Sequence, residues 1–282
     1  MSPPSEDTWS RQRFTALLGR PDEDIDLAEA ALLIACEEYP SLEPDLYLAR
    51  LDAMGEALAA RLPESAEALE VASTLREYLF RQEGFHGNSD KYYDPRNSFL
   101  NEVLDRRTGI PISLSAVYIE VARRAGVPVF GVGLPGHFVV KLQGADREVL
   151  VDPFHGGAVL TPEDCQARLN RIFEGRVKME PRMLAAVTPR QILDRMLRNL
   201  KALYVKEADH PRTLGVLELL LRLDPEGLED LRDRGLVYAA LDCYAYAARD
   251  LEAYLAGAGR TPKTDELVSA LEALRHRASR IN

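Results

Sequence analysis

The spacing of hydrophobic residues predicts a helical region near the start of the chain. From Asp24 to Arg81 the sequence is rich in Ala, Leu and Glu and nearly free of glycine, and its apolar residues recur at the interval of one helix face. We expect three helices here: one that ends before Pro40, one over 45–62 and one over 66–80. The Pro/Ser/Glu-rich first dozen residues predict a frayed tail.

A long polar connection separates these helices from a second helical segment. Residues 84–98 contain the Gly, Asn, Asp and Pro typical of irregular structure, and long loops in compact domains are often functional. A short helix over 99–107 follows, and Pro111 suits the first turn of a new helix over 111–125. One face of that helix is apolar and is predicted to be buried: Leu114, Val117, Tyr118, Val121 and Ala122.

Between residues 128 and 154 the helical spacing gives way to short runs rich in Val and Phe. The runs VPVFGVGL, HFVVKL and EVLVDPF are separated by turn residues and predict strands of a small antiparallel sheet. From about Leu160 the pattern is helical again, and no strand signal follows Pro189. In this tail Tyr204 recurs as Tyr238 after 34 residues, which is the period of tetratricopeptide repeats.

These elements predict an α+β protein in three parts. We expect a helical region over 1–90, a core with the antiparallel sheet over 91–185, and a tail of helical repeats over 186–282.

Composition and charge narrow the class of protein. Hydrophobic residues make up 46% of the chain and charged residues 28%, as in soluble globular proteins. The net charge of −10 disfavours nucleic acid and acidic membrane surfaces as partners. Because no apolar segment has the length of a signal peptide or membrane helix, the cytoplasm is the expected compartment. The cysteines are too few and too scattered for a disulfide framework or a zinc site: Cys36, Cys165 and Cys243.

The last two predicted strands suggest a candidate active site. A turn centred on Gly144-Ala145 places His137 opposite Asp152 and pairs Lys141 with Glu148. Directly opposed residues have Cβ atoms ~4.5–5.5 Å apart, so the carboxylate can orient the imidazole as in acyl-transfer enzymes. A structural interpretation also fits, in which His137 is a strand histidine bonded to Asp152.

A nucleophile for such a site should come from a helix N-terminus, where free N–H groups stabilise developing negative charge. Ser113 lies in the first turn of the 111–125 helix. The order Ser113, His137, Asp152 is that of papain-like cysteine hydrolases and transglutaminases. The competing interpretation is that Ser113 bonds a free backbone N–H at the helix start, as serines commonly do.

Several other patterns are interpreted as structural. The run GVGLPG at 131–136 matches the dinucleotide fingerprint, but a strand rather than a helix follows it. Cys165 is expected to be a small buried hydrophobe. Four possible metal ligands match no recognised spacing, so no metal is expected: His86, His137, Asp152 and His155. Five basic residues predict a solvated face: Arg168, Arg171, Arg176, Lys178 and Arg182. Three loop residues either line the cleft or pack the loop: Tyr92, Tyr93 and Asn97.

The run RRTGIPISLSAVYIEVARRAGVPVFGVGLPGHFVVKL, followed by LVDPFHGG, resembles the bacterial SirB-type family, in which a transglutaminase-like domain precedes tetratricopeptide-like repeats. The resemblance extends to AALLIACEEYP, to GFHGNSDKYYDPRNSFLNEVLDRR and to RNLKALYVKEADHPRTLGVLELLLRLDP. In catalytic relatives a cysteine opens a helix that ends in a Gly-Ile-Pro-like stop, and a histidine and an Asp-Pro pair follow. Gly126-Val127-Pro128, His137 and Asp152-Pro153 match that pattern.

The nucleophile departs from the pattern, because residues 108–116 contain no cysteine. The position falls on or near Ser113, with Pro111 and Ser115 as alternatives. The resemblance therefore implies a papain-like core that has lost its catalytic thiol and binds a protein or peptide through its cleft and repeats. The alternative is a serine-dependent acyl-transfer enzyme, an amidohydrolase or peptidase-like protein, that uses Ser113, His137 and Asp152. No cofactor is expected for either function.

Overall fold

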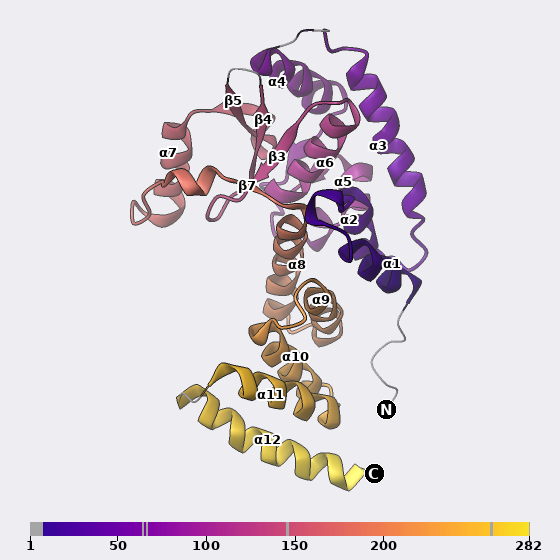
Figure 1. Cartoon of the computed structure of the whole chain (residues 1–282), viewed down its shortest axis with the longest axis vertical. Helices are drawn as coiled ribbons and strands as arrows, with labels where there is room; N and C mark the ends of the chain where they lie inside the picture. The colour runs from indigo at the N-terminus through magenta and orange to yellow at the C-terminus, as the bar shows by residue number, and fades with distance from the viewer. Residues whose placement is uncertain (1–7, 64, 66, 145–146, 260–261, 282) are drawn as a thin grey trace. The chain divides into compact units, whose positions relative to one another are not determined.

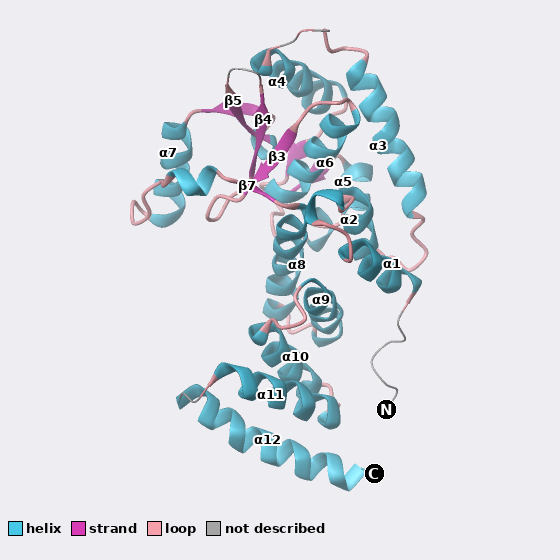
Figure 2. Ribbon diagram, in the orientation of Figure 1, coloured by secondary structure: helices cyan, strands magenta, loops and turns pink. Residues whose placement is uncertain are grey.

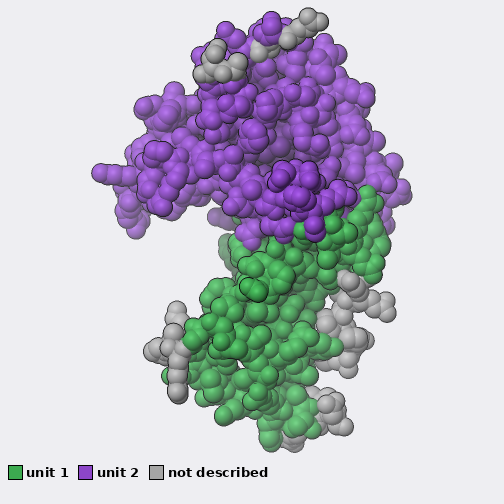
Figure 3. All heavy atoms as spheres, in the orientation of Figure 1, with its two compact units in different colours: residues 1–18, 197–282 green, residues 19–196 purple. Residues whose placement is uncertain are grey.

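The structure is a computed structural model that describes residues 8–63, 65, 67–144, 147–259 and 262–281 (Figure 1). The chain divides into two compact units (Figure 3). Unit 2 comprises residues 19–196, and unit 1 comprises residues 1–18 and 197–282. The domain boundaries predicted after residues 90 and 185 stay predictions.

Unit 2 begins with the predicted helices. They are α2 (Leu27–Ala35), α3 (Pro44–Ala59) and α4 (Ala68–Arg76), and a π-helical segment, η2 (Glu77–Gln82), extends the last one. Asp26 caps α2, since its side chain accepts a hydrogen bond from the Glu29 N–H at 2.9 Å. Pro44 occupies the first turn of α3, where its missing N–H leaves no helical bond unmade. Ala66, where the last helix was expected to start, lies outside the described residues.

The predicted frayed tail is wrong from Trp9 onward. Residues Trp9–Leu18 form α1, which belongs to unit 1. Phe14 is fully buried in this helix, and burial of an aromatic side chain stabilises a short helix that its polar composition alone would not favour. The Arg11 guanidinium also pairs with the Glu218 carboxylate within the same unit.

The centre of unit 2 is the long helix α6 (Pro111–Arg124), preceded by α5 (Leu100–Arg106). Every residue of α6 from Pro111 to Ala122 is buried, because α6 packs against α3, α5 and the sheet. The expected irregular segment 84–98 contains a two-residue strand, β1 (His86–Gly87), parallel to β2 (Thr108–Gly109), and a 3-10 turn, η3 (Pro95–Asn97).

The antiparallel sheet has two more strands than the sequence predicted (Figure 2). Its order is β6-β5-β4-β3-β7. The predicted strands are β3 (Val129–Val132), β4 (Val139–Gln143) and β5 (Glu148–Asp152). The additional edge strands, β6 (Ala158–Leu160) and β7 (Ala186–Val187), have only three and two residues. Runs this short carry no recognisable alternation of apolar and polar residues.

The predicted register of the β4–β5 hairpin is wrong by two residues. Lys141 is opposite Leu150, rather than opposite Glu148 as predicted. The predicted ion pair still forms across the diagonal, with Lys141 Nζ 3.0 Å from Glu148 Oε2. The Gly144 N–H donates to the Arg147 carbonyl at 2.9 Å, so the chain reverses one residue later than a turn at Gly144-Ala145 requires. Ala145 itself lies outside the described residues. Because a two-residue shift preserves the alternation of strand faces, every side chain remains on its predicted face.

The remaining helices follow the predicted pattern. Unit 2 also contains η4 (Pro153–His155), α7 (Pro162–Phe173) and η5 (Pro181–Leu184), as well as η1 (Asp22–Asp24) near its start. Helix α8 (Pro189–Lys206) belongs to unit 2 up to Met196. Unit 1 continues with α9 (His210–Leu223), α10 (Leu228–Ala240), α11 (Tyr244–Ala258) and α12 (Pro262–Ile281).

The tyrosines spaced by 34 residues occupy similar environments in unit 1. Tyr204 and Tyr238 are both almost fully buried, as expected for equivalent positions of successive repeats. Tyr238 belongs to a core cluster that α10, α11 and α12 share, with Leu251, Leu271 and Leu274. Among the described residues, no helix combines the length and apolar character needed to cross a membrane.

Candidate functional site

His137 is held at the entrance to β4 by backbone contacts. Its N–H donates to the Leu134 carbonyl at 3.1 Å, which closes a tight turn in which Gly136 adopts a positive φ of 69°. From α8, Arg195 Nη2 donates to the carbonyls of Leu134 at 3.1 Å and His137 at 2.7 Å. The same guanidinium lies over the Phe138 ring. Arg195 therefore fixes the turn that positions the imidazole.

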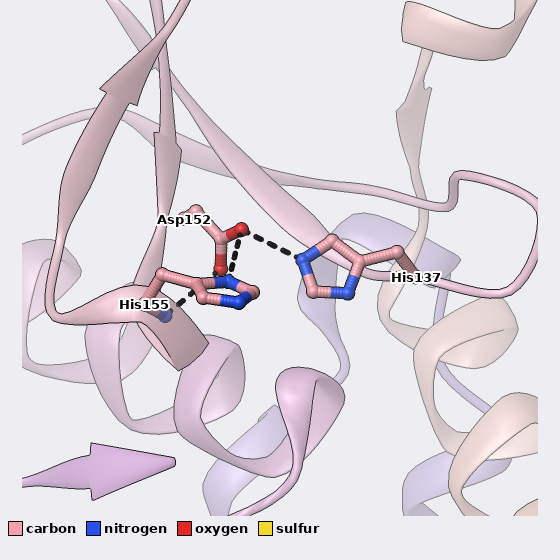
Figure 4. A group of neighbouring side chains, drawn as sticks. All are labelled: His137, Asp152 and His155. Carbon is pink, nitrogen blue, oxygen red and sulfur yellow. Dashed lines mark hydrogen bonds and ion pairs between the residues drawn. The ribbon is translucent and has the colours of Figure 1, made fainter. Parts of the chain in front are cut away.

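Asp152 lies at the end of β5, and its carboxylate is completely buried. His137 Nε2 lies 2.8 Å from Asp152 Oδ2 (Figure 4). In the observed register the two residues are diagonal neighbours on one face, rather than directly opposed as predicted. A hydrogen bond still forms because the side chains reach across the diagonal. Their catalytic role stays a prediction.

Two residues besides His137 contact Asp152. His155 Nδ1 lies 2.9 Å from Asp152 Oδ2, and the His155 backbone N–H donates to Oδ1 at 3.2 Å (Figure 4). Arg168 Nη2, from α7, lies 3.0 Å from the same Oδ2. The prediction that Arg168 belongs to a solvated face is therefore wrong, and its side chain is only 18% exposed.

The contacts around Asp152 determine its charge. Burial raises the pKa of the carboxyl group, but hydrogen bonds from His137 and His155 and the positive charge of Arg168 outweigh burial and hold the pKa below its ordinary value. Because the ionised carboxylate can only accept hydrogen bonds, His137 Nε2 carries the proton between the two groups. His155 Nδ1 lies near Asp152 Oδ2 and also 3.0 Å from the donor Arg168 Nη1. In the neutral imidazole of His137, the lone pair is then on Nδ1.

Ser113 is not hydrogen-bonded to His137; its hydroxyl group is occupied by backbone partners. It donates to the Asn97 carbonyl at 2.6 Å and accepts from the Ile110 N–H at 3.1 Å. The side chain is completely buried. A Cβ atom added to Gly109 would lie 2.7 Å from Ser113 Oγ, so even a methyl group does not fit beside the hydroxyl. This geometry is that of a residue that caps a helix start and ties a loop to it.

The alternative nucleophile positions offer no activated group. Pro111 has no nucleophilic atom, and Ser115 Oγ is buried without a hydrogen-bond partner among the described residues. Cys165 is completely buried in the cluster that includes Val132 and Leu134. Burial raises the pKa of its thiol, so the unreactive protonated form dominates at neutral pH.

Three possible metal ligands converge at the site. The nearest ligand atoms of His137, Asp152 and His155 all lie within 4.8 Å of one another, and two histidines with one carboxylate suit zinc or iron. His86 is not part of this group, since its ring contacts Thr108 Oγ1 and the Gly84 carbonyl. A metal would have to displace the protons between the rings and Asp152, as well as the Arg168 guanidinium. These residues fit a metal only if Arg168 moves away.

The irregular segment 84–98 lies against the site through its aromatic residues. Tyr92 packs edge-on against Phe154 with ring centroids 6.0 Å apart, and Phe154 packs in the same way against His137 at 6.3 Å. Asn97 is fully buried and packs the loop, since its Nδ2 donates to the Lys91 carbonyl at 2.7 Å. Tyr93 is 65% exposed.

A buried imidazole–carboxylate pair at the ends of neighbouring antiparallel strands, with a central helix packed on the same sheet, defines a transglutaminase-like core. The chain matches the family model of the transglutaminase-like superfamily over residues 45–198 and that of the tetratricopeptide repeat over residues 200–275. The chain belongs to the transglutaminase-like superfamily, within the SirB-type group whose members carry the name UPF0162.

Three relatives illustrate this relationship. A UPF0162 protein of Xylella fastidiosa (strain 9a5c) is 42% identical over 238 residues, which cover 83% of this chain and 84% of the relative. A UPF0162 protein of Vibrio cholerae is 31% identical over 268 residues, or 92% of this chain and 97% of the relative. F-box only protein 21 of Pongo abelii is 27% identical over 271 residues, or 84% of this chain and 42% of that protein. No solved structure matches the chain significantly.

Proposed function

We propose that this protein is a catalytically degenerate transglutaminase-like protein that binds a protein or peptide. The observation that carries the proposal is the Ser113 hydroxyl group, whose single proton is donated to the Asn97 carbonyl. A nucleophilic serine must instead donate to its general base. The thiol that opens the helix in catalytic relatives is missing as well.

The contacts of Asp152 support a structural role for the residues that remain. Its carboxylate accepts from the His137 ring and from the His155 backbone N–H, lies 2.9 Å from His155 Nδ1, and pairs with Arg168. These contacts join β4, β5, η4 and α7 in one polar cluster. Such a cluster can be retained because it holds strand ends in place, without any proton transfer.

The helical repeats support a binding role. Tetratricopeptide-like units stack into extended surfaces that bind other proteins, and this family model covers the end of α8, all of α9, α10 and α11, and most of α12. In the F-box relative the matching region makes up 42% of a longer protein. Interaction modules commonly occur in this way, joined to other segments of a longer chain.

The cytoplasm stays the proposed compartment.

Covalent labelling separates the two candidate functions. The wild-type protein is incubated with a fluorophosphonate probe and with an activated acyl ester, and the products are identified by peptide-resolved mass spectrometry. We expect no adduct on Ser113. An adduct that disappears in both Ser113→Ala and His137→Ala would overturn the proposal and establish the acyl-transfer enzyme.

The acyl-transfer alternative rests on one specific feature of the site. The lone pair of neutral His137 is on Nδ1, and no hydrogen bond joins this atom to another described residue. A base with that tautomer could accept a proton from a serine after a local rearrangement that breaks the bond from Ser113 to Asn97. The labelling experiment detects this rearranged state, because even a small active population accumulates adduct.

The binding role has its own test. The full-length protein and unit 2 alone, residues 19–196, are compared in pull-downs from the source cell extract. We expect specific partners of the full-length protein to be lost on truncation. Identical partner sets would assign binding to the transglutaminase-like core alone.

A further inference from the structure

A cavity lies in unit 2, lined by residues outside the His137–Asp152 cluster. It encloses about 620 Å³ between η1, the end of α6 and the edge of the sheet at β3 and β7. Its floor is apolar and includes the buried residues Ile25, Ile119 and Ile192. Phe130 of β3 also lines the cavity and is 42% exposed. A cavity of this size can accommodate several side chains of a ligand.

Inside this cavity one residue at the edge of the sheet, Val129, has no strand residue paired with it in β7. Strand β7 pairs only with Gly131 and Val132 of β3. The Pro128 carbonyl accepts from Gln143 of β4 at 3.1 Å, and successive residues of a strand direct their polar groups to opposite sides. The N–H and C=O of Val129 therefore point away from β4, toward the side where β7 has already ended. The position opposite Val129 in this register falls on Pro189, which has no N–H to donate.

The rim of the cavity is acidic. Five carboxylates line it, against the two guanidinium groups of Arg20 and Arg123: Asp22, Glu23, Asp24, Asp26 and Glu120. Arg190 pairs with Asp22 at 2.8 Å, and Arg124 pairs with Glu120, which leaves one carboxylate in excess. Glu23 and Asp24 are exposed.

The part of the sequence that begins at η1 is acidic as well. Residues 19–91 contain 17 acidic and 6 basic residues. A positively charged ligand would therefore be attracted to this part of the chain.

We propose that this cavity binds an extended peptide segment in which basic residues alternate with aliphatic ones. The peptide lies extended across the cavity and hydrogen-bonds the backbone of Val129, so that this backbone contact supplies part of the affinity. Its aliphatic side chains contact the floor around Phe130, and its basic side chains face Glu23 and Asp24. The inference names a partner class for the binding role proposed above and rests on that role.

The occupant is a partner peptide rather than a second copy of this chain. Pairing two copies through the same edge would bring the excess carboxylates of both rims together, and like charges brought together are unfavourable. An exposed strand edge lined by apolar residues is otherwise a site of unwanted association. A basic partner satisfies both the edge and the rim.

A titration tests the proposal. Fluorescence anisotropy is measured with the labelled hexapeptide Val-Lys-Val-Lys-Val-Lys, with its Val-Glu counterpart, and with a Val-Lys peptide methylated on its central backbone nitrogens. We expect saturable binding of the first peptide only. Glu23→Lys combined with Asp24→Lys should weaken binding about tenfold or more. The matched control combines Glu56→Lys with Glu226→Lys, which changes net charge equally at exposed positions outside the lining, and should alter affinity less than about twofold.

Four outcomes would overturn the proposal. They are no saturable binding at millimolar peptide, equal effects of the two charge reversals, unchanged affinity of the methylated peptide, and a dimer in sedimentation that Phe130→Lys dissociates. The last outcome would assign the edge to a second copy of the chain. The titration tests the cavity alone, whereas the labelling of Ser113 tests the loss of catalysis alone, so the two failures are distinguishable.

Discussion

Ser113→Ala is expected to destabilise unit 2 strongly, because the hydroxyl group serves two buried backbone groups. Its removal leaves the Asn97 carbonyl and the Ile110 N–H without the partners they have at 2.6 and 3.1 Å. Both residues are buried. An unsatisfied buried polar group costs about 1–3 kcal/mol, so we expect a loss of about 2–4 kcal/mol. For a unit of this size that corresponds to a fall in Tm of roughly 5–15 °C.

Ser115→Ala is the matched control in the same helix. Ser115 is equally buried, but its hydroxyl has no hydrogen-bond partner among the described residues. Replacing an unpartnered buried hydroxyl with a methyl group should be neutral or slightly stabilising. Urea unfolding followed by circular dichroism measures both variants. The interpretation of Ser113 as a helix-start residue is refuted if both substitutions leave the unfolding free energy within about 0.5 kcal/mol of the wild type.

Three further predictions concern the cluster around His137. Asp152→Asn should lower the free energy of unfolding by about 3–5 kcal/mol at pH 7. Because the folded-state pKa of Asp152 lies below the ordinary value, the stability advantage of the wild type over this variant should shrink as pH falls below about 4. Urea stabilities of the two proteins that stay parallel between pH 7 and 3 would contradict this prediction. Arg195→Met removes the hydrogen-bond donor to the Leu134 and His137 carbonyls. It should lower the free energy of unfolding by about 1.5–3 kcal/mol and shift the His137 ring resonances in NMR spectra. An unchanged spectrum would exclude a positioning role for Arg195. Arg168→Gln removes the cation beside Asp152 and should raise the affinity for zinc about tenfold or more, as measured by calorimetry. Equal zinc affinities of the variant and the wild type would contradict this prediction.

Strong hydrophobic periodicity explains which elements could be predicted from the sequence. The apolar stripe of α6 is long and uninterrupted, and its boundaries at Pro111 and Gly126 carry well-defined start and stop signals. By contrast, β7 has two residues, and it is a strand only because β3 lies beside it. Such an element is specified by tertiary packing rather than by its own sequence.

The His137–Asp152 contact was predicted through a register that proved wrong. The contact survives because the error was an even number of residues, which preserves the face of each strand. A one-residue error would have placed the imidazole and the carboxylate on opposite faces. The sequence therefore determined the shared face more firmly than the directly opposed partner.

The remaining contacts of the site differ in how readily the sequence predicts them. His155 follows Asp152 by three residues, and that spacing is typical of an Asp side chain that caps a turn. Arg168 lies on α7, and the Ser113 bond reaches Asn97 across the loop and α5. Contacts between residues so far apart in sequence depend on how the helices and strands pack, and no local sequence pattern predicts them.

The most direct test of the central claim is the reactivity of the thiol introduced by Ser113→Cys. A thiol beside a properly aimed imidazole forms thiolate at neutral pH, whereas a buried thiol without such a partner stays protonated. Peptide-resolved alkylation with iodoacetamide compares its rate with that of the half-buried Cys243 in the same chain. We predict that the introduced thiol reacts more slowly than Cys243, by roughly tenfold or more. A faster reaction that His137→Ala abolishes would show an intact active site and contradict the account.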